Sequence, residues 1–319
     1  KSIILITHKL QEIKDVADRC TIIRRGKFID VIDVAATSKN EMAAKMVGRP
    51  VEFKVQKAPA KPGEAVLDIQ HLKVIGSKKV PAVNDFSLQV RTGEIVGIAG
   101  VDGNGQSELV HALSGLMPIA EGTVLLCGKD ITKTSIRERN ESGMGLVPED
   151  RQKHGLVMQY TIAENTIIKS YYKEPFQKHG FLHKNKMFSF AGDITKQFDV
   201  RSGEGVYSAA RNLSGGNQQK AILGREIALD PELLIAVQPT RGLDVGAIEA
   251  IHKELVKHRD RGRAVLLISF ELDEIFNLSD RIAVMHRGAL TGIVRPEETT
   301  VEEVGLMMAG DKHKHGGQQ

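Results

Sequence analysis

The chain has 319 residues, of which 41% are hydrophobic and 26% are charged, and this is an ordinary globular composition. A net charge of +4 with no tryptophan and four tyrosines gives no indication of a nucleic-acid partner. No apolar run approaches the roughly 20 residues that a membrane span requires. The lone cysteines Cys20 and Cys127 lie in apolar runs, which favours core packing in a reducing compartment over a disulfide.

The beginning of the chain is repeated near its end. Residues 2–48 lie over residues 264–310 without a gap, so that Gly26 falls on Gly288. A repeat of this length is typical of tandem homologous domains. We therefore expect a C-terminal fragment that begins inside one domain and continues as a complete second one. The expected division is a first-domain tail at 1–48, a linker at 49–63, the second domain at 64–310 and a disordered tail at 311–319.

The predicted elements start with a continuous apolar run at residues 2–8, which is typical of a buried parallel strand. A short helix at 9–18 and a strand pair around Gly26 follow. Residues 49–64 contain three prolines and no sustained periodicity, which indicates a linker.

The larger part of the chain alternates between strands and helices. Residues 158–210 are rich in polar and helix-forming residues and indicate a helical insertion. The expected strands are 66–74 and 83–90 as an antiparallel pair, then 94–100, 233–237 and 264–268 as buried strands, each of these three followed by a helix. Such alternation predicts a parallel sheet with helices on both faces.

Residues 100–107 read G-V-D-G-N-G-Q-S and fit the phosphate loop G-x-x-x-x-G-K-[ST] at every fixed position but one. Backbone N–H groups of such a loop surround phosphates, and the following helix adds partial positive charge. Ser107 is placed to contact Mg²⁺, and Gln106 replaces the lysine. A strand–turn–helix corner without a ligand stays open as an alternative. The candidate nucleotide-binding residues are Gly100, Asp102, Gly103, Asn104, Gly105, Gln106, Ser107 and Glu108.

Residues 213–220 read L-S-G-G-N-Q-Q-K, which closely resembles the signature motif of ABC ATPases. The resemblance implies an α/β P-loop NTPase fold of the ABC ATPase type, with a mostly parallel core sheet, an antiparallel β subdomain and a helical insertion. It also implies that two such domains close head to tail, with each ATP between the phosphate loop of one and the signature of the other. The signature residues are Ser214, Gly215, Gly216, Asn217 and Gln218.

Further positions match the family by order and spacing. In L-L-I-A-V-Q-P-T-R-G-L-D, Val237 replaces the Mg²⁺-binding aspartate, Gln238 replaces the catalytic glutamate, and Asp244 keeps the D-loop aspartate. In I-S-F-E-L-D-E-I, Phe270 replaces the switch histidine. Glu149, in V-P-E-D-R, stands where the Q-loop usually has glutamine.

These departures fall on one nucleotide site. Loss of a lysine beside the γ-phosphate forfeits roughly 4 kcal/mol at an effective dielectric constant of 20. Gln238 cannot accept a proton, which typically costs about 10²–10⁴ in rate. We expect this site to bind ATP with negligible hydrolysis, and the signature to serve a live site on the other domain. His8 falls on the switch position of that first domain. Chance decay of the whole domain is the alternative.

The combined motifs resemble the ATP-binding subunit of bacterial importers for simple sugars such as ribose, and more specifically the nucleoside branch. The resemblance implies an ATP-hydrolysing subunit that uses ATP and Mg²⁺, peripheral at the cytoplasmic face of the inner membrane. The implied partners are permease transmembrane subunits near Glu149, Asp150 and Arg151, a substrate-binding protein, the missing first domain and possibly a second copy, with no nucleic acid.

Two other functions stay open. One is an ATP-binding regulatory module that never hydrolyses, and the other is a soluble, non-transport ABC ATPase acting on ribosomes or DNA. The residues 1–319 alone are expected to be inactive, because they own no complete composite site.

Overall fold

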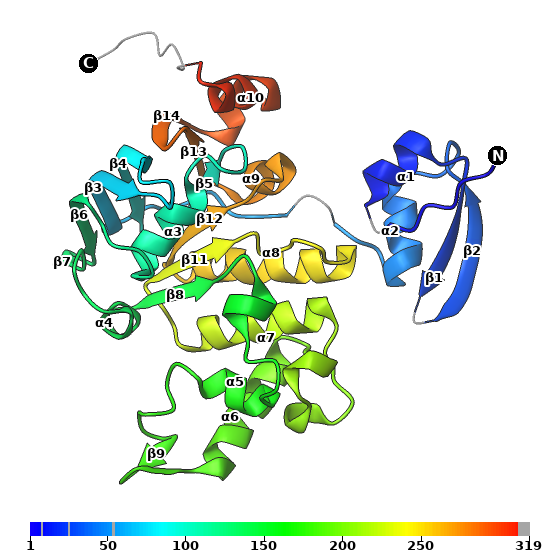
Figure 1. Cartoon of the computed structure of the whole chain (residues 1–319). Helices are drawn as coiled ribbons and strands as arrows, with labels where there is room; N and C mark the ends of the chain where they lie inside the picture. Colours follow the sequence, from blue (N-terminus) through cyan, green and yellow to red (C-terminus); the bar gives the residue numbers. More distant parts are fainter. Residues whose placement is uncertain (8, 25, 53–54, 312–319) are drawn as a thin grey trace.

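The computed structural model describes residues 1–7, 9–24, 26–52 and 55–311. Figure 1 shows a small N-terminal unit joined by an extended segment to a larger α/β domain. His8 lies outside the described residues.

The N-terminal unit is a β-hairpin covered by two helices. Its core contains Leu10, Ile22 and Met42, which are almost fully buried. Its elements are α1 (Leu10–Val16), β1 (Arg19–Arg24), β2 (Lys27–Asp33) and α2 (Lys39–Val47). Ser38 caps the start of α2 and Gly48, with φ of 90°, ends it. The predicted helix and strand pair are confirmed here.

The prediction of a buried strand at residues 2–8 is wrong for the described residues 2–7. This segment has no regular structure, and the side chains of Ile3, Ile4 and Ile6 are more than 90% exposed. The matching run in the second copy, residues 264–268, lies in a sheet between two parallel strands, residues 233–237 and 95–99. Within the described chain, residues 2–7 pair with no strand, and an apolar run alone cannot satisfy its backbone groups.

The large domain is built on a six-stranded sheet in the order β14-β13-β5-β12-β11-β8. The first strand is antiparallel to its neighbour and all other pairs are parallel. The bounds are β5 (Ile95–Ala99), β8 (Met144–Val147), β11 (Leu233–Val237), β12 (Ala264–Ile268), β13 (Arg281–His286) and β14 (Ala289–Val294). Every residue of β5, β11 and β12 is buried, which explains their unbroken apolar sequence.

An antiparallel sheet in the order β4-β3-β6-β7 packs beside this core and confirms the predicted antiparallel subdomain. Its strands are β3 (Ala65–Ile75), β4 (Pro81–Arg91), β6 (Glu121–Leu126) and β7 (Lys129–Asp130). Cys127 is exposed in the turn between β6 and β7, so its predicted core position is wrong. The turn places it outside the apolar face that the strand before it buries.

Helices surround the parallel sheet (Figure 1). They are α3 (Gln106–Ser114), α4 (Ile136–Glu141), α7 (Gly215–Ala228), α8 (Val245–Asp260), α9 (Leu272–Leu278) and α10 (Val301–Ala309), with a 3-10 turn η4 (Pro296–Glu298). Among the described residues, no helix combines the length and apolar composition needed to cross a membrane.

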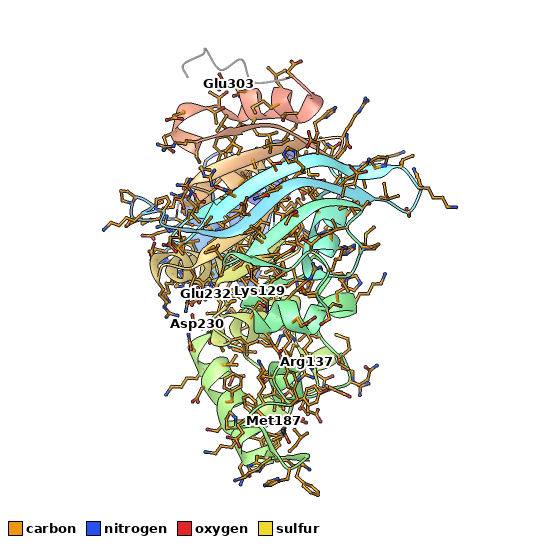
Figure 2. All side chains as sticks on the ribbon, turned by 90° about the vertical axis from the view of Figure 1, so that its left-hand side faces the viewer. Lys129, Arg137, Met187, Asp230, Glu232 and Glu303 are labelled. Atoms are coloured by element: carbon orange, nitrogen blue, oxygen red, sulfur yellow. The ribbon has the colours of Figure 1, made fainter. Side chains whose placement is uncertain are left out.

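The predicted insertion is largely helical and forms the lower end of the molecule in Figure 1. In Figure 2, Met187 marks that end and Glu303 the opposite one. The segment 151–212, which contains the predicted insertion 158–210, comprises η1 (Arg151–Gly155), α5 (Ile162–Ile167), β9 (Gln177–Lys178), β10 (Phe181–Leu182), α6 (Lys184–Gln197), η2 (Gly205–Tyr207) and η3 (Ala210–Asn212). The segment η1 is a π-helical turn, and β9 and β10 form a short hairpin.

Candidate functional site

The predicted phosphate loop leaves the carboxyl end of β5 and opens α3. Gly103 and Gly105 adopt φ of 83° and 102°, which L side chains rarely reach. A Cβ at Gly105 would lie 2.1 Å from the carbonyl oxygen of Ala82. A Cβ at Gly103 would meet nothing within 4 Å, so this part of the loop borders open space. The loop therefore has the tight, exposed backbone that phosphate binding requires.

Asn104 ties the loop to the turn after β13. Its carbonyl oxygen accepts a hydrogen bond from the N–H of Gly288 at 2.9 Å, and its side-chain oxygen accepts one from the N–H of Arg287 at 3.0 Å. Asp102 is exposed and Glu108 is half-buried. The backbone and the side chain of Asn104 thus hold the loop against the turn after β13.

Gln106 is folded back into the loop. Its side chain is 2% exposed, and its Nε2 donates to the carbonyl oxygen of Val101 at 3.2 Å. Its Oε1 is buried without a hydrogen-bond partner among the described residues. The residue at the lysine position therefore contributes no charge and braces the loop from inside.

The helix that follows the loop borders a cavity of about 660 Å³. Ser107, Glu149 and Val237 all line it, so the structure brings these predicted positions together. Glu149 forms an ion pair with Arg241, and Arg151 donates from Nη1 to the carbonyl oxygen of Arg241 at 3.0 Å. Motif spacing could not predict these two contacts, because each joins segments about 90 residues apart in the sequence.

Two further substituted positions follow β11 and β12. Gln238 directly follows β11 with φ of 47°, and its N–H donates to the carbonyl oxygen of Ile268 at 2.8 Å. Its side chain is 5% exposed, and Nε2 has no hydrogen-bond partner in the described chain. Phe270 is half-buried in the turn after β12. These groups offer no carboxylate or imidazole at the carboxyl ends of β11 and β12.

The loop after β11 and the helix α9 share a buried polar cluster that sequence reasoning missed. One carboxylate oxygen of Glu274 accepts from Thr240 at 2.7 Å and contacts Nε2 of His252 at 2.8 Å. All three side chains are buried. No spacing rule joins these residues, because they come from three separate elements.

The predicted signature residues form the start of α7. Ser214 is the exposed N-cap, and its hydroxyl oxygen accepts from the backbone N–H of Asn217 at 3.4 Å and from its Nδ2 at 3.0 Å. Gly215 and Gly216 form the first turn, where unpaired N–H groups point out of the helix. Gln218 is buried and donates to the carbonyl oxygen of Ala210 at 3.1 Å, which fixes the helix on the insertion.

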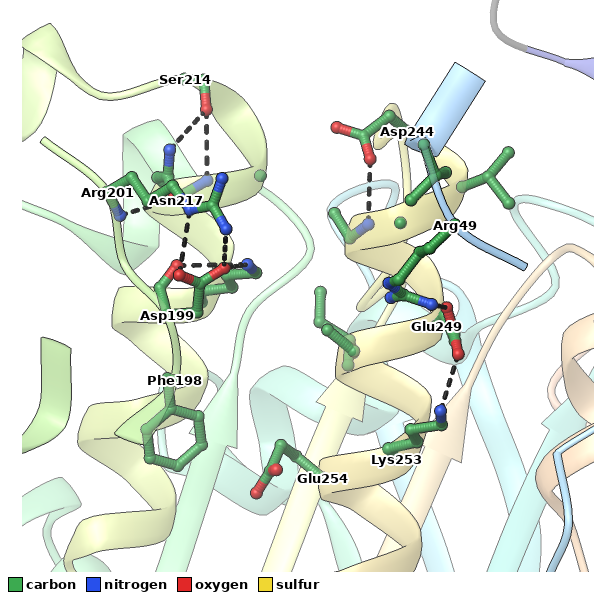
Figure 3. Close-up of a pocket in the computed structure, with 18 of the residues that line it drawn as sticks. Arg49, Phe198, Asp199, Arg201, Ser214, Asn217, Asp244, Glu249, Lys253 and Glu254 are labelled. Atoms are coloured by element: carbon green, nitrogen blue, oxygen red, sulfur yellow. Dashed lines mark hydrogen bonds and ion pairs between the residues drawn. The ribbon is translucent and has the colours of Figure 1, made fainter. Parts of the chain in front are cut away.

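A second cavity, of about 780 Å³, lies beside the signature. Ser214 and Asn217 line it from α7, and Asp244 lines it from the start of α8 (Figure 3). Asp244 caps α8 by accepting from the N–H of Ala247 at 2.9 Å. Arg49, at the end of the N-terminal unit, pairs with Glu249 at 2.7 Å on the same side (Figure 3). The signature therefore does not line the cavity that holds Ser107 and Val237.

Comparison with known proteins supports the predicted fold. Residues 83–241 match the family model described as ABC transporter. A solved dimeric, post-hydrolysis ATP-binding cassette bound to ADP and Pi superposes with a TM-score of 0.63 at 21% identity, covering 72% of this chain and 98% of that chain.

This chain contains an ABC transporter ATP-binding domain. The ABC domain has the predicted fold, with the predicted phosphate loop between β5 and α3 and the predicted signature at the start of α7. Its two motifs line different cavities.

Two curated relatives extend the match of the ABC domain to nearly the whole chain. The nucleoside import ATP-binding protein NupA of Lactococcus lactis subsp. cremoris is 55% identical over 97% of this chain. The guanosine import ATP-binding protein NupO of Bacillus subtilis is 54% identical over 99% of it. The chain spans 61% and 62% of the length of these relatives. Each alignment covers 97–99% of this chain as one match. This finding contradicts the prediction that the chain is a C-terminal fragment of two fused ABC domains.

The residues of the ABC domain fit the phosphates of a nucleotide better than they fit a metal ion. The strained glycines and the start of α3 present backbone N–H groups, and open space lies at Gly103. Ser107 offers a hydroxyl ligand, but Val237 offers no oxygen. In the described ranges, no group of three or more His, Cys, Asp or Glu side chains could hold a metal ion. Mg²⁺ would therefore depend on Ser107, water and phosphate oxygens.

Proposed function

We propose that this chain is an ATP-binding component of an importer for nucleosides, in which its own nucleotide site holds ATP without hydrolysing it. In the same proposal, its signature completes a catalytic site on another ABC domain. The observation that carries the proposal is the contrast between the two cavities. At the first site, Gln106, Val237 and Gln238 replace the lysine, aspartate and glutamate that the ABC motifs carry, although charged residues such as Glu149 and Arg241 still line the cavity. The second keeps Ser214 and Asp244 exposed at its rim.

The geometry gives each motif a separate task. The phosphate loop binds by backbone N–H groups, which act on bound phosphates and need no lysine. Gln238 can orient water by hydrogen bonding but cannot take its proton. ATP at the catalytic site of the other domain would supply the phosphoanhydride bond whose cleavage drives transport, and Mg²⁺ would neutralise phosphate charge. The amides that follow Ser214 can stabilise charge on a γ-phosphate presented by another domain.

The nucleoside class is supported by the relatives of the chain. Two proteins at 54–55% identity are named for nucleoside and guanosine import. A ribose import ATP-binding protein of Rubrobacter xylanophilus is 36% identical over 95% of the chain. By the same reasoning, we place the chain at the cytoplasmic face of the cell membrane, on permease subunits served by a substrate-binding protein.

The proposal is tested by measuring ATP binding and phosphate release with purified residues 1–319. We expect saturable ATP binding with phosphate release at the background rate. Gly105→Ala serves as the binding control, because its new methyl group meets the carbonyl oxygen of Ala82 and distorts the loop. Phosphate release that Ser214→Arg abolishes would show that the chain forms a complete catalytic site by itself, and the proposal would fail.

A further inference from the structure

The hairpin of β9 and β10 exposes two large apolar side chains at the tip of the insertion. Phe181 is 77% exposed and Leu182 is 52% exposed. Figure 1 places the hairpin at the extremity of the molecule, remote from α10. Single exposed apolar residues are common, but two neighbours at the end of a projecting turn are a typical contact surface.

The hairpin is a defined structure. Phe181 pairs with Lys178, and the two residues between them, His179 and Gly180, have φ of 53° and 85°. Positive φ at both central residues makes the tight turn whose twist suits a two-stranded ribbon. The side-chain oxygen of Gln177 also accepts from the N–H of Gly180 at 2.9 Å. The turn therefore fixes where Phe181 points.

A buried aromatic residue anchors the base of the hairpin. Phe176 is 6% exposed and packs with Met187 and Ala191 of α6. Its ring lies 5.1 Å from that of Phe190, measured between centroids. The carbonyl oxygen of Phe176 accepts from the N–H of His183 at 2.7 Å, which closes the ribbon. The chain thus buries one phenylalanine to hold the hairpin and leaves Phe181 outside.

Positive charge surrounds the exposed pair. Residues 173–186 contain four lysines and one glutamate, a net charge of 4 − 1 = +3 with histidines neutral, against +4 for the whole chain. Lys178, Lys184 and Lys186 are exposed and take part in no ion pair within the described chain. Free lysines around an apolar tip complement a surface that is negatively charged outside and apolar beneath, which describes an anionic lipid leaflet.

We propose that the β9–β10 hairpin is a membrane-surface contact that inserts Phe181 and Leu182 between anionic lipid headgroups. The lysines attract the headgroups, and the two apolar side chains enter the acyl boundary. This contact is separate from ATP binding, because no hairpin residue lines either cavity.

The chain contains no tryptophan, so Phe181→Trp introduces a single fluorophore at the tip. With phosphatidylglycerol vesicles, we expect its emission to shift to shorter wavelength and its quenching by aqueous acrylamide to fall. Phosphatidylcholine vesicles should have no such effect. The matched control is Leu306→Trp, at a 57% exposed position on α10, which should respond to neither vesicle.

A charge test uses the combined variant Lys178→Gln, Lys184→Gln and Lys186→Gln. Co-sedimentation with phosphatidylglycerol vesicles should weaken by about fivefold for each lysine removed. The control variant Lys78→Gln, Lys129→Gln and Lys133→Gln removes the same charge from exposed positions elsewhere and should bind almost as the parent chain does. Retained ATP binding shows that each variant is folded.

Three results would overturn the proposal. If anionic vesicles change neither the emission nor the quenching of the indole at position 181, the hairpin tip does not enter the lipid. If both triple lysine variants lose vesicle binding equally, the binding is a nonspecific charge attraction and does not depend on the hairpin. Shielding of the indole only by a lipid-free, purified permease makes the hairpin a protein interface instead.

Discussion

Gln106 shows how one residue can preserve a loop while removing its charge. Its amide donates to the carbonyl oxygen of Val101, so the loop keeps its shape without a phosphate ligand. The Oε1 of the same side chain is a buried acceptor that finds no donor in the part of the chain that the structure describes. A lysine at this position would give up the contact to Val101 in order to reach bound phosphates.

Gln106→Lys should therefore tighten ATP binding without starting hydrolysis. The added charge stabilises the phosphates of bound ATP in the ground state. Val237 still offers no metal ligand and Gln238 still offers no base, so hydrolysis should not start. Equilibrium binding of ATP and phosphate release are measured on the same preparation, with Gln106→Met as the uncharged control of similar size. Robust hydrolysis by Gln106→Lys alone would remove Val237 and Gln238 from the roles assigned to them.

A second residue-scale effect concerns stability. His258 is 1% exposed, and its pKa is lowered from 6.5 to about 4, chiefly by burial and in part by Arg263 and Arg261, while Asp230 opposes this shift. Between these two pH values the unfolded chain binds the proton and the folded chain does not, so stability falls as the pH falls from about 6.5 to 4.

The contribution of His258 should make the free energy of unfolding about 2 kcal/mol lower at pH 5 than at pH 7. In His258→Gln this part of the pH dependence should be absent, because glutamine does not titrate. Urea unfolding at both pH values measures the difference. An unchanged pH dependence in the variant would show that His258 charges without cost in the folded state.

At the scale of elements, α7 connects the signature to the insertion and the parallel sheet. Glu226 on α7 is fully buried and accepts from Lys169 at 2.6 Å, from Arg225 at 2.9 Å and from the N–H of Leu146 at 3.1 Å. Burial would raise the pKa of Glu226, but Lys169 and Arg225 hold it below its usual value. Arg225 also donates to the carbonyl oxygen of Gly155 at 3.0 Å, at the end of η1.

Glu226→Ala should lower the free energy of unfolding by about 3–5 kcal/mol, because the buried Arg225 and the partly exposed Lys169 both lose their partner. Glu121→Ala is the matched control, since it breaks an exposed pair with Lys73 and should cost at most about 1 kcal/mol. Urea denaturation compares the two variants with the parent chain. Similar losses in both variants would mean that the buried network is not held by Glu226.

The elements also show what sequence can predict. The strands β11 and β12 have the predicted bounds, because five consecutive buried residues leave an unbroken apolar run. The same signal failed at residues 2–7, since periodicity indicates burial but cannot supply neighbouring strands. Motif spacing predicted a phosphate loop and a signature, and the structure places both segments at the starts of helices, α3 and α7. It could not predict the inward fold of Gln106, which depends on a carbonyl group that the loop itself presents.

At the scale of the whole molecule, the predicted phosphate loop and the predicted signature differ in how many of the family's functional residues they keep. The phosphate loop keeps its backbone, but Gln106, Val237 and Gln238 replace three charged residues of the ABC motifs, whereas Ser214 and Asp244 remain exposed on the rim of the second cavity. Random loss of function would be expected to alter both cavities, whereas here the residues on the rim of the second cavity are kept. We expect that rim to act on nucleotide held by another ABC domain.

The most direct test compares two variants in the assembled importer that contains this chain. Ser214→Arg places a bulky side chain on the signature and should abolish phosphate release, whereas Gln106→Ala should leave most of it intact. ATP-dependent phosphate release in reconstituted vesicles is the measurement. Loss of activity with Ser214→Arg and its retention with Gln106→Ala would agree with the division of labour proposed here. Equal losses in the two variants, or a larger loss with Gln106→Ala, would contradict it.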